Sequence, residues 1–283
     1  MREINAGLGG FTLLQAPNMT EIQMMSYVLT SPTGRVLVID GGNAGDADCL
    51  RAQILARGGH VDLWLITHCH NDHYDALLEI AKDPRGVTVG KIGYNFPPQE
   101  WVDGIEPEEK AHNDPMYAFL AAGEIPCVTL SAGDVLDFDG ARIDVLADPA
   151  DFAQFTPDSP NGGSSVNDTS LVFRFTFPNG KTALFLGDLG LRAGDILAGR
   201  YGEALKSDIV QMAHHGQNGA GENVYRLIRP EICLWTAPMW LYNNDLGAGF
   251  DTWKFKTVIV RGWMEKLGVT CHVVEGEGAA LLR

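Results

Sequence analysis

The sequence predicts an α/β protein whose two related halves face each other across one site. Short apolar runs such as 61–66 alternate with helical patterns such as 46–57, an order typical of sheets covered by helices. Histidine and acidic residues directly follow several of these runs, which is where α/β folds place their binding sites. The segments 62–68 and 208–214 also share one pattern, which is described below.

Composition and charge narrow the classes of function. The 283 residues are 45% hydrophobic and 20% charged, which suits a globular protein, and we expect a single domain over 1–283. A net charge of −15 disfavours long nucleic acids as partners, because an acidic surface repels polyanions. Five cysteines without a close pair predict free thiols in a reducing compartment. No signal-peptide pattern or bilayer-length apolar stretch is found, so we expect a cytoplasmic protein without a membrane partner. The oligomeric state is not indicated.

The first part of the chain is predicted to form strands, two helices and an insertion. The strands are expected at 11–14, 25–29, 36–39 and 61–66, and the helices at 46–57 and from about 74 to 82. Residues 94–126 contain Phe96-Pro97-Pro98 and a helix start near Glu106-Pro107. They predict a helical insertion that covers the active site.

The second part is predicted to be rich in short strands. A hairpin is expected around Pro178-Asn179-Gly180, and residues 155–167, rich in Pro, Gly, Ser and Asn, predict a loop. The strands are expected at 128–130, 135–138, 142–146, 171–177, 182–186, 207–213, 232–236, 269–274 and 279–282, and the helices at 224–228 and 258–267.

The densest functional pattern is H-x-H-x-D-H, formed by His68, His70, Asp72 and His73. It directly follows the predicted buried strand 61–66, so the four side chains are expected on the loop at its carboxyl end. Neutral imidazoles suit zinc, manganese or iron, and a carboxylate compensates the charge of the cation. The pattern therefore predicts a metal site. Cys69, inside the motif, is expected to be a packed thiol.

A weak internal repeat links the two halves. Asp62 precedes His68 by six positions, and Asp208 precedes His214 by the same interval across a second apolar run. Upstream, Asp40 and Asp188 each end a predicted strand. This repeat predicts that both halves supply ligands to one site, and that His214 occupies the position equivalent to His68.

At these motifs the chain resembles the metallo-β-lactamase-fold hydrolases. The resemblance implies an αββα sandwich with two mixed sheets flanked by helices. It also implies two divalent metal ions, with zinc expected and manganese as the alternative. His68 and His70 would bind the first metal, and Asp72 and His73 the second.

Further residues follow from the same resemblance. Asp188, preceded by Gly187, would bridge the two metals, since a carboxylate can divide its oxygens between two cations. Asp40 would support the metal loop from behind. His214 and His215 would supply the remaining imidazole ligand or a proton donor.

One element departs from the usual pattern. Most members carry a histidine in a Gly-His-Thr context between the metal loop and the bridging aspartate, but this chain has Asn167-Asp168-Thr169-Ser170. Together with Gly187-Asp188 and His214-His215-Gly216, this stretch resembles the hydrolase domain of the ComEC/Rec2 competence proteins. Asp168 could supply an oxygen to the first metal, which would favour manganese over zinc. Alternatively, Asn167 and Asp168 are loop-forming residues.

The resemblance implies a binuclear metal-dependent hydrolase in which a metal-bound hydroxide attacks an ester centre. Asp72 would orient the hydroxide, and His214 or His215 would protonate the leaving group. The expected substrate is a phosphodiester in a small molecule or short nucleotide. One alternative is a hydrolase of carboxylic esters, lactones or thioesters that uses the same site. A second alternative is a non-hydrolytic metal-binding or sensor protein.

Overall fold

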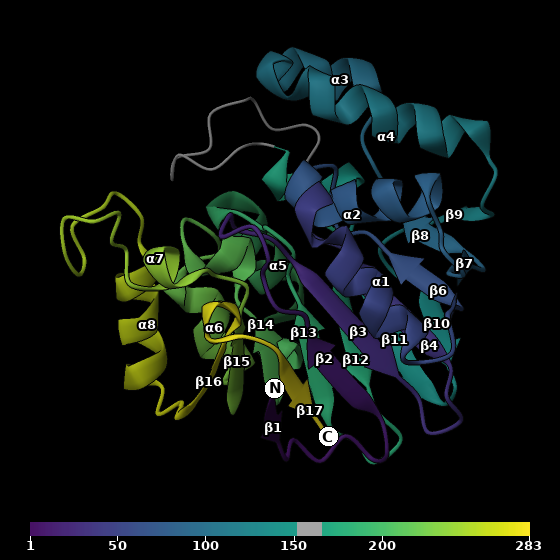
Figure 1. Ribbon diagram of the computed structural model, residues 1–283. Coiled ribbons are helices and arrows are strands. Elements are labelled where there is room, and N and C mark those ends of the chain that lie inside the picture. Colours follow the sequence, from purple (N-terminus) through teal and green to yellow (C-terminus); the bar gives the residue numbers. More distant parts are fainter. Residues whose placement is uncertain (152–165) are drawn as a thin grey trace.

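Two sheets pack face to face at the centre of the protein, and helices cover their outer faces (Figure 1). The computed structural model describes residues 1–151 and 166–283. Both sheets mix parallel and antiparallel neighbours: β4 pairs with β3 in antiparallel and with β6 in parallel orientation. The predicted αββα sandwich is therefore confirmed.

The first sheet combines strands from both ends of the chain, whereas the second contains β10 to β16 in chain order. In spatial order, the first sheet contains β1 (Arg2–Ile4), β17 (Ala280–Leu282), β2 (Thr12–Gln15), β3 (Ser26–Thr30), β4 (Val36–Asp40), β6 (Leu63–Leu65), β8 (Ile92–Tyr94) and β9 (Cys127–Thr129). The second contains β10 (Val135–Phe138), β11 (Ala141–Ala147), β12 (Val172–Thr176), β13 (Thr182–Phe185), β14 (Ile209–Gln211), β15 (Ile232–Trp235) and β16 (Cys271–Val274). A separate pair is formed by β5 (His60–Val61) and β7 (Thr88–Val89).

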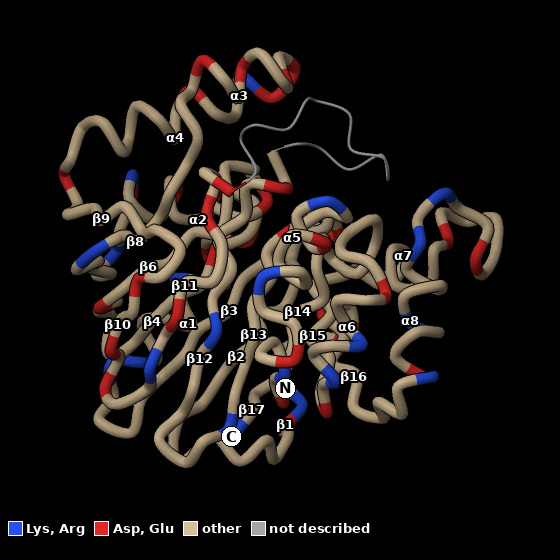
Figure 2. The backbone as a smooth tube through the Cα atoms, turned by 180° about the vertical axis from the view of Figure 1, so that it is seen from behind, with Lys and Arg blue, Asp and Glu red and all other residues tan. Residues whose placement is uncertain are grey.

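The helices divide between the two outer faces. The first sheet is accompanied by α1 (Ala47–Leu55), α2 (Asn71–Lys82), α3 (Gln99–Ile105) and α4 (Lys110–Ala122). The second is accompanied by α5 (Leu191–Tyr201), α6 (Glu222–Ile228), α7 (Met239–Tyr242) and α8 (Thr257–Lys266). In the part of the chain that the structure describes, no helix has the length and hydropathy needed to cross a bilayer. Figure 2 shows acidic residues on most elements, in keeping with the net charge.

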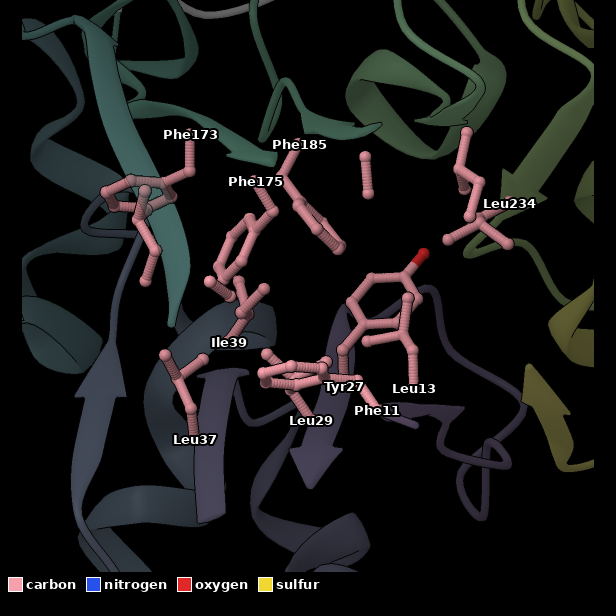
Figure 3. Packing of buried hydrophobic residues seen from close by; sticks show 14 of the residues in the cluster. Phe11, Leu13, Tyr27, Leu29, Leu37, Ile39, Phe173, Phe175, Phe185 and Leu234 are labelled. Carbon is pink, nitrogen blue, oxygen red and sulfur yellow. The ribbon is translucent and has the colours of Figure 1, made fainter. Parts of the chain in front are cut away.

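The central core lies between the sheets and is rich in aromatic rings (Figure 3). Phe185 of the second sheet meets Tyr27 of the first with ring centroids 5.2 Å apart, and Phe175 packs beside Phe185 at 5.4 Å. Alternate residues of each strand point into this core, while their neighbours pack under the helices: Tyr27 points inward and Val28 outward. Burial on both faces explains why the strands are apolar without alternation.

The internal repeat is visible in the hydrogen bonds. Asp62 accepts from the Val36 amide at 2.9 Å and from the neighbouring Arg35 side chain at 2.8 Å. In the second half, Asp208 accepts from the Thr182 amide at 2.8 Å. Each aspartate thus ties the start of its own strand to the first residue of the parallel neighbour, β4 or β13. The two halves therefore share local structure as well as a sequence pattern.

Several boundaries differ from the prediction. The expected strand 61–66 is divided into β5 and β6. Asp62 lies between them and accepts a hydrogen bond from Val36, the first residue of β4. Helix α2 begins at Asn71 instead of 74, so the second half of the metal motif lies in its first turn and not on a loop. The short helix α7 was not predicted. Residues 155–165 of the predicted loop 155–167 lie outside the described residues.

Candidate metal centre

The candidate site lies where strands of both sheets end. Asp40 is the last residue of β4, and His68 comes three residues after β6. From the second half, Asp188 follows β13 and His215 follows β14. The carboxyl ends of parallel strands in both halves thus supply polar side chains to one place.

The first half contributes imidazoles that lie very close together. His68 Nε2 and His70 Nδ1 are 3.0 Å apart, and the His68 and His73 rings have centroids 4.2 Å apart. Burial, with help from His73 and His70, holds the pKa of His68 well below its ordinary value. Its imidazole is therefore neutral and offers a lone pair to a cation.

The Asp188 carboxylate lies between the two halves. Its Oδ1 is 3.3 Å from His73 Nε2, and its Oδ2 is 3.3 Å from His215 Nε2. Asp72 Oδ2 approaches the same His215 atom at 3.1 Å. The two oxygens of Asp188 are therefore divided between two groups of donors, the arrangement expected of a bridging carboxylate.

The donor set fits a pair of metal cations. In the described chain, two buried groups have all ligand atoms within 4.8 Å of one another: His68, His73 and Asp188, and Asp72, His73 and His215. His73 Nε2, His215 Nε2 and Asp188 Oδ1 are buried without a well-formed hydrogen bond. Buried polar atoms are rarely left so, and cations would satisfy them all.

The charges of the site also favour cations. Burial alone would lower the pKa of His215, but the carboxylates of Asp188 and Asp72 outweigh it and raise that pKa to about 10. Burial would raise the pKa of Asp188, yet His215, His73 and His214 hold it well below its usual range. The same negative field that stabilises a proton on His215 would attract a metal ion.

Groups behind the ligands fix which nitrogen faces the centre. Asp40 accepts from the Thr67 amide at 2.7 Å and from His73 Nδ1 at 2.7 Å, so it supports both the loop and the imidazole. His215 Nδ1 donates to the Thr236 carbonyl at 2.8 Å. With Nδ1 occupied in this way, Nε2 of both histidines is left to bind metal.

The adjacent histidines lie differently in the site, and the sequence left open which of them is a ligand. His215 enters the ligand cluster, while His214 lines the cleft with Nε2 3.8 Å from Asp188 Oδ2. The backbone is left-handed at both residues, with φ of 51° and 55°. The turn therefore occurs at the histidines themselves and swings His215 inward.

Asp168 is placed away from the ligand cluster. Its Oδ1 accepts from the Gly190 amide at 2.9 Å, at the start of α5, and it belongs to neither ligand group of the described residues. Burial raises its pKa to about 6. The geometry thus favours the loop-forming role for Asp168, and the argument that its oxygen selects manganese loses its basis.

The family model of the metallo-β-lactamase superfamily matches residues 19–230. The chain belongs to the metallo-β-lactamase superfamily. It is also similar to the competence protein ComA of Neisseria gonorrhoeae, with 30% identity over 131 residues. That match covers 44% of this chain and 19% of ComA, so the chain spans only about a fifth of that relative. The similarity agrees with the predicted resemblance to the competence-protein hydrolase domain.

Solved structures of the superfamily share the fold at low identity. The metallo-β-lactamase fold protein YhfI from Bacillus subtilis has a TM-score of 0.55 and 13% identity, covering 93% of this chain and 95% of its own. CmlA, a diiron β-hydroxylase from Streptomyces venezuelae, has a TM-score of 0.55 and 13% identity, covering 96% of this chain and 54% of CmlA. One fold thus carries more than one chemistry.

The metallo-β-lactamase site of this chain opens into a cleft of about 600 Å³. Several residues of the cleft were not predicted from the sequence, among them Glu106, Asn167 and Gln217. Glu106, from the insertion, has Oε2 2.8 Å from His70 Nε2. Asn167 Nδ2 lies 3.4 Å from His214 Nε2, and Gln217 lines the wall. No local sequence pattern marks these residues as part of the site. Glu106 and Asn167, for example, contact histidines that lie 36 or more residues away in the sequence.

Proposed function

We propose that this protein is a binuclear metal-dependent hydrolase that cleaves a phosphodiester, with zinc as the metal. The observation that carries the proposal is the buried group of unpaired donors at the floor of the cleft, above all the Asp188 carboxylate between His73 and His215. His68 and His70 would hold one ion, and Asp72, His73 and His215 the other.

When bound, the two ions would supply Lewis acidity: they activate water and stabilise the charge that develops on the substrate. The side chains have separate tasks. Asp72 would accept a hydrogen bond from the attacking water and orient it. Burial lowers the pKa of His214 to about 4, so its imidazole is neutral and would take up the proton that the attacking water releases. From the cleft wall, His214 would deliver that proton to the leaving oxygen.

The choice of a phosphodiester rests on the similarity to ComA and on the competence-protein motif around Asn167. We propose a small-molecule or short-nucleotide substrate, because an acidic protein disfavours long polyanions. A second candidate is a hydrolase of carboxylic esters, lactones or thioesters. The observation that favours it is that no Lys or Arg occurs among the described residues that line the cleft. We also propose a cytoplasmic setting, which suits the five free cysteines.

The test combines metal content with turnover. The purified protein should hold one to two transition-metal ions and hydrolyse bis(p-nitrophenyl) phosphate faster than p-nitrophenyl acetate. A chelator should abolish both activities. Asp188→Asn should lower metal content and turnover together, while Asp48→Asn, an exposed control, should change neither. Preference for the acetate ester would favour the second candidate. Bound metal without turnover of either ester would favour a non-hydrolytic metal-binding protein.

A further inference from the structure

We propose that the cleft selects a substrate whose group beside the scissile bond is positively charged, such as a quaternary ammonium. This inference rests on the proposed hydrolase function and names its substrate class. It is carried by an acidic wall, an aromatic wall and the lack of basic side chains between them.

The acidic wall comes from the helical insertion. Glu106, Glu108 and Glu109 follow α3 and line the cleft together with the ligand His70. Lys110 is the single basic residue of 94–126, and it bonds Asp103 and Asp114, each at 2.7 Å. Within the described chain, Glu108 and Glu109 form no ion pair. The negative charges of Glu108 and Glu109 can therefore interact with a ligand in the cleft.

Glu106 brings a buried carboxylate to this wall. The residue is buried, with 8% of its surface exposed, and it lines the cleft. Oε2 is bonded to His70 Nε2, but Oε1 has no hydrogen-bond partner. A buried carboxylate oxygen without a partner is costly, and a cationic group in the cleft would compensate its charge.

The aromatic wall comes from the second half of the chain. Trp240 and Phe255 line the same cleft, with ring centroids 6.2 Å apart and tilted by 47°. Trp240 Nε1 donates to the Glu21 carbonyl at 2.8 Å, which fixes the indole in place. Aromatic faces attract cations through their quadrupole, and Trp is the most effective of them.

One basic side chain reaches the aromatic wall from outside the cleft: Lys254 Nζ lies 5.7 Å from the Phe255 ring centroid, but Lys254 does not line the cleft. No Lys or Arg lines the cleft among the described residues, and the sequence of residues 152–165 contains neither. Two divalent ions supply four positive charges, but the carboxyl groups around them carry more. Those groups are Asp40, Asp72, Asp188, Glu106, Glu108 and Glu109. The glutamate wall of the cleft therefore stays negative even when metal ions are bound, which attracts a cationic group beside a phosphate that binds the ions.

The experiment compares choline with 3,3-dimethylbutan-1-ol, which has the same shape but no charge, by calorimetric binding to the metal-loaded protein. Choline should bind about tenfold more tightly than the alcohol. The double variant Glu108→Gln/Glu109→Gln should lose most of this preference, and Trp240→Leu should reduce it. Glu124→Gln, an exposed glutamate of the same insertion that does not line the cleft, is the matched control and should behave as wild type.

Turnover then separates this inference from the proposed function. The substrates are two p-nitrophenyl phosphodiesters that carry either a trimethylammonioethyl or a 3,3-dimethylbutyl group. The cationic ester should have the higher kcat/KM, through a lower KM. Hydrolysis of both esters at equal kcat/KM, or equal binding of both alcohols, would overturn the charge preference and leave the hydrolase proposal standing. Tight choline binding without any hydrolysis would sustain the cation site and refute the hydrolase.

Discussion

At the scale of single residues, the site depends on groups that would not touch a metal. Each ligand imidazole is oriented through its second nitrogen: His73 by Asp40, His215 by the Thr236 carbonyl and His70 by Glu106. These partners come from a strand end, a loop and the insertion. Because such contacts fix ring orientation and ligand basicity, metal affinity is distributed over the fold.

Glu106 offers the clearest test of this dependence. Glu106→Ala removes the acceptor for His70 Nε2 and should weaken metal binding by about 10–100-fold without unfolding the protein. Glu106→Gln keeps an acceptor oxygen and should restore much of that loss. Titration against a chromogenic chelator measures both affinities, and Glu124→Ala is the control. Equal affinities in all variants would show that Glu106 does not position His70.

The two adjacent histidines should separate metal binding from proton transfer. His215 has Nε2 between two carboxylates, so His215→Ala should lower metal content along with rate. His214 lies at the edge of this cluster, so His214→Ala should keep the metal and cost on the order of 10²–10⁴ in rate. The loss should be smaller for a substrate with a good leaving group. Metal analysis and kinetics of both variants provide the measurement. Full metal and full activity in both would refute the assignment.

At the scale of elements, the repeated aspartates predict how acid weakens the fold. Burial alone would raise the pKa of Asp62, but the Arg35 side chain and the Val36 amide lower it, and Thr182 and Lys181 likewise lower that of Asp208. Folded pKa values below the unfolded value of about 3.9 mean that this stabilisation is complete above that pH and lost as pH falls through the folded values.

Asp62→Asn and Asp208→Asn should each reduce the free energy of unfolding by about 1–2 kcal/mol at pH 7. The gap from wild type should narrow at pH 3, because the wild-type carboxyl groups are then partly protonated. Urea denaturation at the two pH values measures this, with exposed Asp48→Asn as the control. A gap of the same size at both pH values would contradict a role for the ionised carboxylates.

The insertion is more than a surface cover. Met116 of α4 is fully buried in the cluster under the first sheet, and Tyr74 of α2 donates to Asn113 of the insertion at 3.0 Å. Removing α4 should therefore destabilise the fold and not only open the cleft. Met116→Ala should cost about 2–5 kcal/mol in denaturation experiments, as for other buried methionines. Exposed Met19→Ala should stay within about 0.5 kcal/mol. A Met116→Ala protein as stable as wild type would show that α4 covers the site without contributing to the core.

What the sequence revealed depended on how local the relevant contacts are. The H-x-H-x-D-H motif and Gly187-Asp188 were recognisable because their ligands lie within a few residues of a strand end. Glu106 was missed because 36 residues separate it from His70. The roles of His214 and His215 stayed open because they depend on two left-handed residues, which side-chain patterns do not encode. Asp168 was ambiguous because one carboxylate suits a metal and a helix start equally well.

At the scale of the whole molecule, the metal centre joins the two halves of the sandwich. Asp72 and His73 come from the first half, and Asp188 and His215 from the second. The ligands lie together only when both sheets are packed, so metal binding should stabilise the folded state specifically. Without metal, the buried carboxylates of Asp72 and Asp188 depend on the histidines alone for compensation.

Removing the metal should therefore lower the Tm. Metal at 100 times its Kd adds about 2.7 kcal/mol to the free energy of unfolding, which for a chain of this size corresponds to roughly 4–5 °C. Calorimetry of the chelated and metal-loaded protein measures the shift, which should grow with the logarithm of metal concentration. Asp188→Asn removes the carboxylate that links the two halves, so this variant should lose most of the metal-dependent increase in Tm. If wild-type protein bound metal stoichiometrically with no change in Tm, the unfolded chain would bind the ions equally well, and a site built from both packed halves would not be needed. The bridging role of Asp188 would then be wrong.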